Sequence, residues 1–319
     1  MGSLIGHVLP GLGFFFIGLW QLINHIKLHS LNPKSYTAKI FFPTKKSRYG
    51  ELYFMMAGSA MSIMMELFIG PVKHQPFDVD GTIPTTHLHN FEHASISLTI
   101  FTYAAFAVIL DRFGRPSTKY GMTLSLGVIA FWQEYLLFHL HSTDHMGLEG
   151  HYHWFLQILI IVSFITTVLG IPYQKSFLIS FVRSFSIAFQ GIWYNVMGIM
   201  LWTKGLMPKG CFMHLEEAHY VVRCETDAAL DRAKALTTLE FSWYLVICVI
   251  MAMGLYLYMI KVYPEKEGYE SLAKYELEDN HDEKELVDDK DDDDTEAQKK
   301  NSKRGLLNGF IKTGKEFKE

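Results

Sequence analysis

Seven long apolar stretches limit what this chain can fold into. A helix that crosses a membrane needs about 20 mostly apolar residues. The stretches run near residues 4–24, 50–71, 88–110, 120–141, 152–172, 178–203 and 238–262. The first lacks the basic leader and the small-residue cleavage site of a signal peptide, so we expect a retained helix. The sequence predicts an all-α, polytopic membrane protein with a seven-transmembrane-helix bundle over residues 1–263.

The charges in the connecting segments predict the orientation of these helices. Lysine and arginine gather in alternate connections, at Lys27, Lys34, Lys39, Lys45, Lys46, Arg48, Arg112, Arg115, Lys119 and Lys175. The other connections carry acids, at Asp78, Asp80, Asp144 and Glu149, against Lys73 alone. The positive-inside rule then places the N-terminus on the exoplasmic side and the C-terminus in the cytosol. We expect Arg183 to extend to the cytosolic interface.

Two features of the longer polar segments bear on this topology. The 204–237 connection has mixed charge, which weakens the orientation argument, and its Cys211 and Cys224 could pair if it faces an oxidising compartment. Residues 264–319 contain runs such as DDKDDDD and KKNSKR, which predict a largely disordered cytosolic tail. This tail is the candidate site for a cytosolic protein partner. The body of the chain is near neutral, so nucleic acid is not an expected partner.

Nine of the fifteen histidines lie at the predicted exoplasmic end of the apolar stretches. They are His7, His87, His89, His93, His139, His141, His145, His151 and His153. Glutamates accompany them at positions 66, 92, 134 and 149, whereas the opposite half holds far fewer polar groups. Ionisable groups at membrane depth are costly and usually mark a functional site.

The spacing of these residues places them in stripes along helices. His89 and His93 are four residues apart, as are Glu149 and His153, so each pair shares a helix face. A bundle that turns such stripes inward would bring several imidazoles and carboxylates together, the ligands of zinc or, second, iron. The candidate metal ligands are His7, His89, His93, His141, His151, His153 and Glu149.

Two glutamates and two residues of the sixth stretch complete the candidate site. Glu66 and Glu134 lie among apolar residues, where a carboxylate needs a cation, a proton or a metal, so both are candidate catalytic groups. Gln190 and Trp193 are candidate supporting residues. The alternative reading is a proton-sharing polar network that only holds the helices together. For each histidine taken singly, the alternative is a hydrogen-bonded side chain near the headgroups.

Several sequence blocks resemble the transmembrane protein 45 family, its plant branch most of all. The blocks are GHVLPG, MELFIG, DGTIPTTHLHNFEH, EYLLFHLH, HSTDHMGLEG, EGHYH and FQGIW, in order over about residues 1–262. The resemblance implies a multi-pass protein with seven spans, without a settled activity. It implies a shared set of site residues, comprising His7, Glu66, His93, Glu134, His141, His151, His153, Gln190 and Trp193, with an acid at position 149. His89 and His145 are implied only for the plant-like branch.

Three functions fit these residues. A membrane-embedded, metal-dependent hydrolase would act on a membrane lipid, with Glu134 or Glu66 as general base; an iron hydroxylase is a variant, although its HxxHH box is absent. A transporter would use the cluster as an ion or proton relay, but no inverted repeat is visible. A receptor-like or scaffold protein would act through its tail. Plasma membrane and endomembranes are not distinguished by the sequence.

Overall fold

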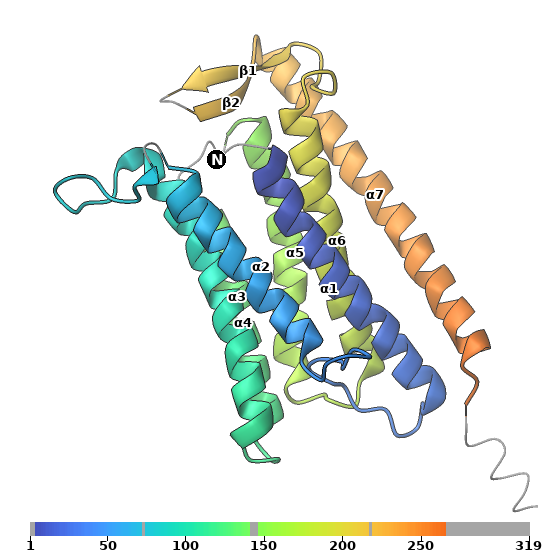
Figure 1. The fold of residues 1–319 in the computed structure, drawn as a ribbon. Coiled ribbons are helices and arrows are strands. Elements are labelled where there is room, and N and C mark those ends of the chain that lie inside the picture. The colour runs from blue at the N-terminus through green and yellow to red at the C-terminus, as the bar shows by residue number, and fades with distance from the viewer. Residues whose placement is uncertain (1–3, 72–73, 141–145, 217–218, 266–319) are drawn as a thin grey trace, which may run out of the picture. The chain divides into compact units, whose positions relative to one another are not determined.

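The computed structural model describes residues 4–71, 74–140, 146–216 and 219–265, and these residues are mostly helical (Figure 1). The described helices are α1 (Leu4–Leu31), α2 (Gly50–Met64), α3 (Leu88–Phe113), α4 (Lys119–His139), α5 (Leu148–Gly170), α6 (Phe177–Trp202) and α7 (Asp227–Val262). Each of the seven predicted apolar stretches lies on one of them. Residues 266–319 of the predicted tail lie outside the described residues.

Six helices in the described part of the chain are long and apolar enough to cross a membrane. They are all of the helices above except α6, with α2 counted together with the π-helical turn Met65–Ile69. Large apolar side chains on their outer faces are exposed, such as Trp243 and Met251 of α7, which are 67% and 69% exposed. Such surfaces suit lipid rather than water. The chain is therefore an integral, multi-pass membrane protein.

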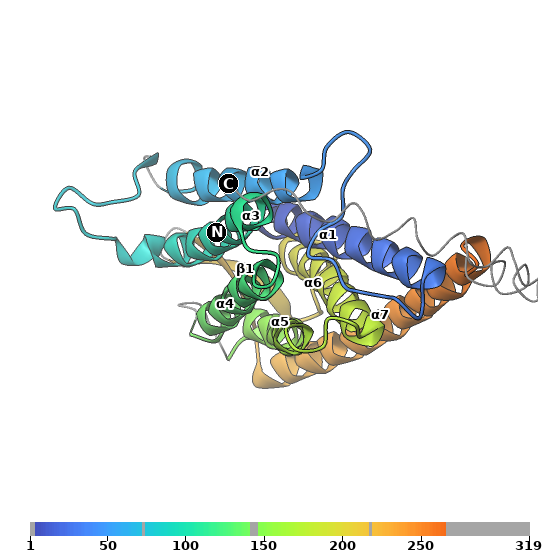
Figure 2. The ribbon, with the colours of Figure 1, turned by 90° about the horizontal axis from the view of Figure 1, so that it is seen from below.

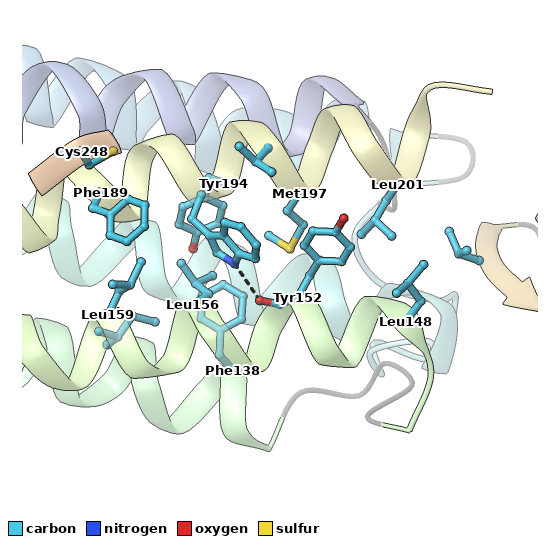
Figure 3. Close-up of a cluster of buried hydrophobic side chains, with 14 of the residues drawn as sticks. Phe138, Leu148, Tyr152, Leu156, Leu159, Phe189, Tyr194, Met197, Leu201 and Cys248 are labelled. Carbon is cyan, nitrogen blue, oxygen red and sulfur yellow. Dashed lines mark hydrogen bonds between the residues drawn. The ribbon is translucent and has the colours of Figure 1, made fainter. Parts of the chain in front are cut away.

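Helix α6 occupies the interior of the helix bundle, packed against α1, α5 and α7 (Figure 2). Most of the residues of α6 are buried, and its apolar side chains pack with those of α5 in the main hydrophobic core (Figure 3). Trp193 is fully buried there and donates from Nε1 to the Tyr152 carbonyl at 2.9 Å. The predicted supporting residue Trp193 is thus a packing residue of this core.

Glycines allow α1 and α6 to approach closely. A Cβ added at Gly18 would lie 2.2 Å from the Ala188 nitrogen, and one at Gly191 would lie 2.2 Å from the Phe15 nitrogen. Small residues at such positions let helix backbones pack together within a membrane. The close contact of α1 and α6 therefore depends on the absence of these side chains.

The 204–237 connection contains a β-hairpin, which the all-α prediction missed. Strand β1 (Cys211–Glu216) pairs antiparallel with β2 (His219–Cys224), and Cys211 and Cys224 are cross-strand partners joined by a disulfide. Val221 and Val222 are buried. The short β-branched run in the second strand favours this pairing, whereas apolar length alone only identifies membrane helices.

The two ends of the bundle differ in character. The hairpin, the starts of α1, α3, α5 and α7 and the ends of α2, α4 and α6 lie at one end, here called the hairpin end (Figure 1). The opposite end carries the basic connections and is here called the basic end. There the α1–α2 connection packs inward: Tyr36, Ala38 and Phe42 are buried, and the Ala38 nitrogen donates to the Gln174 carbonyl at 2.8 Å.

Candidate functional site

Five polar side chains from four helices gather at the hairpin end. This inner cluster consists of His7, Glu66, Asn90, His93 and His153. Its residues come from α1, the π-helical turn that ends α2, α3 and α5. Turns of this wider kind interrupt helices most often at functional positions. The structure therefore pairs four of the residues chosen from sequence, Glu66 with His93 and His7 with His153, and adds Asn90.

Glu66 is held by hydrogen bonds from α3. Asn90 donates from Nδ2 to Glu66 Oε2 at 2.7 Å, and His93 Nδ1 lies 3.3 Å from Glu66 Oε1. Asn90 is buried, and the side chains of Glu66 and His93 are 12% and 24% exposed. Both carboxylate oxygens thus have a protein partner, which offsets the cost of placing a carboxylate among apolar residues.

His7 and His153 approach each other from α1 and α5. Both are buried, and their ring centroids are 6.3 Å apart. The His7 ring also stacks on Trp202, with centroids 4.5 Å apart. Gly198 makes room for this arrangement, since a Cβ there would lie 2.7 Å from the His7 Cβ. These contacts hold the two imidazoles near each other inside the bundle.

The Phe138 ring lies close to both halves of the inner cluster. Its centroid is 5.5 Å from that of His153 and 6.4 Å from that of His93. Among the described residues no group of three or more His, Cys, Asp or Glu side chains is arranged to hold a metal ion. The inner cluster is therefore made of two pairs of ionisable side chains, His7 with His153 and His93 with Glu66.

The other predicted metal ligands lie around these pairs or outside the described residues. His89 lies one turn before His93, with ring centroids 6.2 Å apart. Glu149 is buried in the first turn of α5. His141 and His145 lie in the segment 141–145, outside the described residues.

His151 does not face the inner cluster. Its Nε2 lies 3.0 Å from the Thr238 hydroxyl of α7, and it lines a cavity of about 340 Å³. We call this cavity, whose walls come from α4, α5 and α7, the lateral pocket; its lining residues are His139, Gly150, His151, Trp154, Gln157 and Lys234. The histidines of this end therefore divide into two sites on different faces of α5.

Glu134 and Gln190 lie deeper in the bundle than the inner cluster. Glu134 is one turn below Phe138 on α4; it is buried, and Tyr194 is its hydrogen-bonding neighbour. Gln190 donates from Nε2 to the Ser163 hydroxyl at 2.6 Å. Within the described part of the chain, the Oε1 atoms of Glu134 and Gln190 are buried without a hydrogen-bond partner. An unsatisfied buried acceptor is costly, so the Glu134 carboxylate suits a bound proton, water or ligand, and the Gln190 amide oxygen suits a water or a ligand donor.

A second buried polar group at the basic end was not predicted. Glu51 accepts from Gln21 Nε2 at 2.7 Å and from the Phe42 backbone nitrogen at 2.8 Å. His25 Nδ1 lies 2.8 Å from the Tyr36 hydroxyl, and burial raises the pKa of Tyr36 to about 12, so the hydroxyl keeps its proton. The expectation of few polar groups in this half is therefore wrong.

Arg183 is a buried cation at the basic end. It is only 4% exposed, and a Cβ added at Gly170 of α5 would lie 3.1 Å from its Nη1. Because Arg183 is buried against α5, the expectation that it extends to the interface is wrong. The sequence did contain a signal for the buried polar group at this end, because Gln21, His25 and His29 share one helix face. It was missed because the predicted apolar stretch ends at residue 24, whereas α1 continues to Leu31.

Residues 120–257 match the model of a family described as a family of unknown function, DUF716. The matched segment runs from α4 to near the end of α7. It contains Glu134, Glu149, His153 and Gln190, whereas His7, Glu66 and His93 precede it. Over this segment the chain is similar to DUF716, and the match agrees with its resemblance to the transmembrane protein 45 family, itself of unknown function.

Proposed function

We propose that the protein crosses the membrane seven times, with the hairpin end exoplasmic and the basic end cytosolic. The Cys211–Cys224 disulfide supports this orientation, because disulfides persist in oxidising compartments. Helix α6 is the seventh span: its 26 residues extend about 39 Å, more than the apolar thickness of a bilayer. Its polar residues face other helices rather than lipid. The motifs around His89 and His145 support a plant-type member of the transmembrane protein 45 family.

The inner cluster is proposed to bind a transition metal, zinc before iron. The observation that carries this proposal is the approach of His7 and His153, both buried, from two helices distant in sequence. Zinc binds imidazole nitrogens at about 2.0–2.1 Å. Small side-chain rotations would therefore let the His7 and His153 rings, whose centroids are 6.3 Å apart, bind one ion. Glu149 and His93 are the described candidates for further ligands, and His141 is a candidate by sequence.

The proposed reaction is hydrolysis of a membrane lipid. Bound zinc would supply a water acidified to near-neutral pH. Of the two predicted bases, Glu134 fits better, because its Oε1 has no hydrogen-bond donor in the described structure, whereas both oxygens of Glu66 are occupied. Phe138 and Trp202 would limit the access of bulk water to the buried imidazoles.

The alternative is a non-enzymatic protein in which the same residues form a polar network between helices. The hydrogen bonds of Glu66 with Asn90 and His93 favour it, since they satisfy that carboxylate without a metal. A scaffold, a receptor-like protein or an ion and proton transporter would each use such a network.

Metal analysis distinguishes these proposals. The full chain would be purified in mild detergent without a polyhistidine tag, and its metals counted by elemental mass spectrometry. We expect about one zinc per chain, lost in a His7→Ala/His153→Ala variant and kept in His151→Ala, whose side chain lies in the lateral pocket. No metal in the wild-type protein, with all three proteins equally folded by thermal melting, would leave the polar network as the better account.

The catalytic proposal needs a separate experiment. Glu134→Gln should keep the metal content and the melting temperature but lose at least about a hundredfold in lipid hydrolysis, because a general base contributes about 10²–10⁴ in rate. Glu66→Gln is the matched comparison. Equal hydrolysis by wild type and Glu134→Gln would remove Glu134 from the reaction.

A further inference from the structure

The lateral pocket is a second site at the hairpin end, separate from the inner cluster. It lies on the outer side of α5, closed on either side by α4 and α7. Its charged and titratable lining groups are Lys234, His139 and His151, and none of its lining residues is acidic. Within the described part of the chain, Lys234 forms no ion pair with a carboxylate. The pocket therefore presents an uncompensated positive charge.

The hydrogen bonds of the two histidines show how they are held. Gln157 donates from Nε2 to the Phe138 carbonyl at 3.2 Å, so its Oε1 accepts from His139 Nδ1 at 3.1 Å. On the other wall the Thr238 hydroxyl donates to the Lys234 carbonyl at 3.0 Å and so accepts from His151 Nε2, also at 3.0 Å. Each neutral imidazole thus donates its one N–H to the protein, and its second nitrogen donates to a ligand only when the ring is protonated.

An apolar stripe leads from the pocket along α5. Trp154, Ile158 and Ile165 follow one another at helical spacing on one face, and they are 53%, 40% and 48% exposed. The cavity, about 340 Å³, is too small to enclose a two-chain lipid but large enough for a headgroup. A ligand with an anionic head and an apolar tail matches both parts, whereas a free anion matches only the pocket.

We propose that the lateral pocket binds the phosphate group of a membrane phospholipid. Lys234 is the cationic anchor, and His139 and His151 donate to the phosphate oxygens from their second nitrogens when the anionic headgroup holds their rings protonated. The acyl chains run along the stripe of Trp154, Ile158 and Ile165. Basic pockets between membrane helices bind lipid headgroups by the same chemistry. This proposal is independent of a metal in the inner cluster, since the two sites share no side chain.

Lipid binding to the purified full chain tests the proposal. Three ligands would be titrated in detergent and followed by native mass spectrometry and thermal shift: dioleoyl phosphatidic acid, dioleoylglycerol, which has the same chains without phosphate, and inorganic phosphate. We expect phosphatidic acid to bind at least about tenfold more tightly than either of the others, since charge-assisted hydrogen bonds contribute most of the headgroup affinity. Equal binding of dioleoylglycerol would overturn the role of phosphate, and equal binding of inorganic phosphate would overturn the lipid.

Matched variants locate the binding site. Lys234→Met should weaken phosphatidic acid binding about tenfold or more. Lys261→Met makes the same change near the other end of α7, far from the pocket, and should leave the affinity unchanged. His151→Gln provides a second variant that keeps side-chain polarity and should weaken binding by a smaller factor. Equal affinities in Lys234→Met and Lys261→Met, with unchanged melting temperatures, would place the lipid elsewhere and overturn the proposal.

Discussion

Single residues at the basic end show how a buried charge is accommodated in this bundle. Glu51 is 4% exposed and accepts two hydrogen bonds, one from α1 and one from the α1–α2 connection. Its carboxylate therefore joins three parts of the chain that are distant in sequence. The energetic role of such a group is to fix one arrangement of the helices, since it is the acceptor of a backbone nitrogen and of a side-chain amide from two other parts of the chain.

Replacing Glu51 by leucine should lower stability. The change leaves the Phe42 nitrogen without its acceptor and removes one of the two acceptors of Gln21 Nε2, which keeps the Ile40 carbonyl at 3.2 Å. A buried unsatisfied donor costs about 1–3 kcal/mol. Glu225→Leu is the control, because Glu225 is exposed beside the hairpin. Thermal melting in detergent should show a clear fall for Glu51→Leu and little change for the control. Equal melting temperatures would mean that Glu51 does not hold this end together.

The pairing of side chains in the candidate site could not be predicted from the sequence. The pairing of His93 with Glu66 and of His7 with His153 depends on which helices are neighbours, and spacing along a single helix does not contain that information. Periodicity could place His89 with His93 on one face and separate His151 from His153, which are two residues apart on α5, but it could not identify the partners that each face meets. Asn90 was missed because an amide beside histidines carries no metal-binding pattern.

At the scale of elements, the contact between α1 and α6 organises the bundle. It joins the first helix to the interior one and carries residues of both polar regions, with His7 at one end and His25 and Arg183 at the other. The length of the apolar stretches was enough to predict these helices. Their pairing was not predicted, because it depends on which glycines lie where the backbones of the two helices come into contact.

Adding a methyl group at this contact should destabilise the bundle. In Gly191→Ala the new Cβ would lie 2.2 Å from the Phe15 nitrogen, so the backbones must separate. Gly13→Ala is the matched control on α1, where nothing lies within 4 Å of the added atom. We expect Gly191→Ala to cost about 1–3 kcal/mol of stability, as overpacking does, and Gly13→Ala to be neutral or slightly stabilising. Measuring thermal unfolding and the monodisperse yield after purification compares the two; similar results would exclude a close α1–α6 contact.

For the whole molecule, the central question is which side of the membrane each end faces. The hairpin end carries the disulfide, the inner cluster and the lateral pocket, and the basic end carries most of the lysines among the described residues. The charge rule and the disulfide are independent arguments, one from membrane insertion and one from redox chemistry, and both support the proposed exoplasmic position of the hairpin end. In that orientation both proposed sites work outside the cytosol, and their ligands must be available there.

Cysteine labelling in sealed microsomes, whose lumen corresponds to the exoplasmic side, tests this orientation in either type of membrane. In a Cys248→Ala background, Cys211 and Cys224 are first reduced with a permeant reagent and then exposed to a membrane-impermeant maleimide. We expect labelling only after detergent opens the vesicles, whereas a Cys211→Ser/Cys224→Ser/Ser47→Cys variant, with its thiol in the α1–α2 connection, should be labelled in sealed vesicles. The reverse pattern would place the hairpin end in the cytosol, where the disulfide would not persist and cytosolic lipids would be the ligands to test.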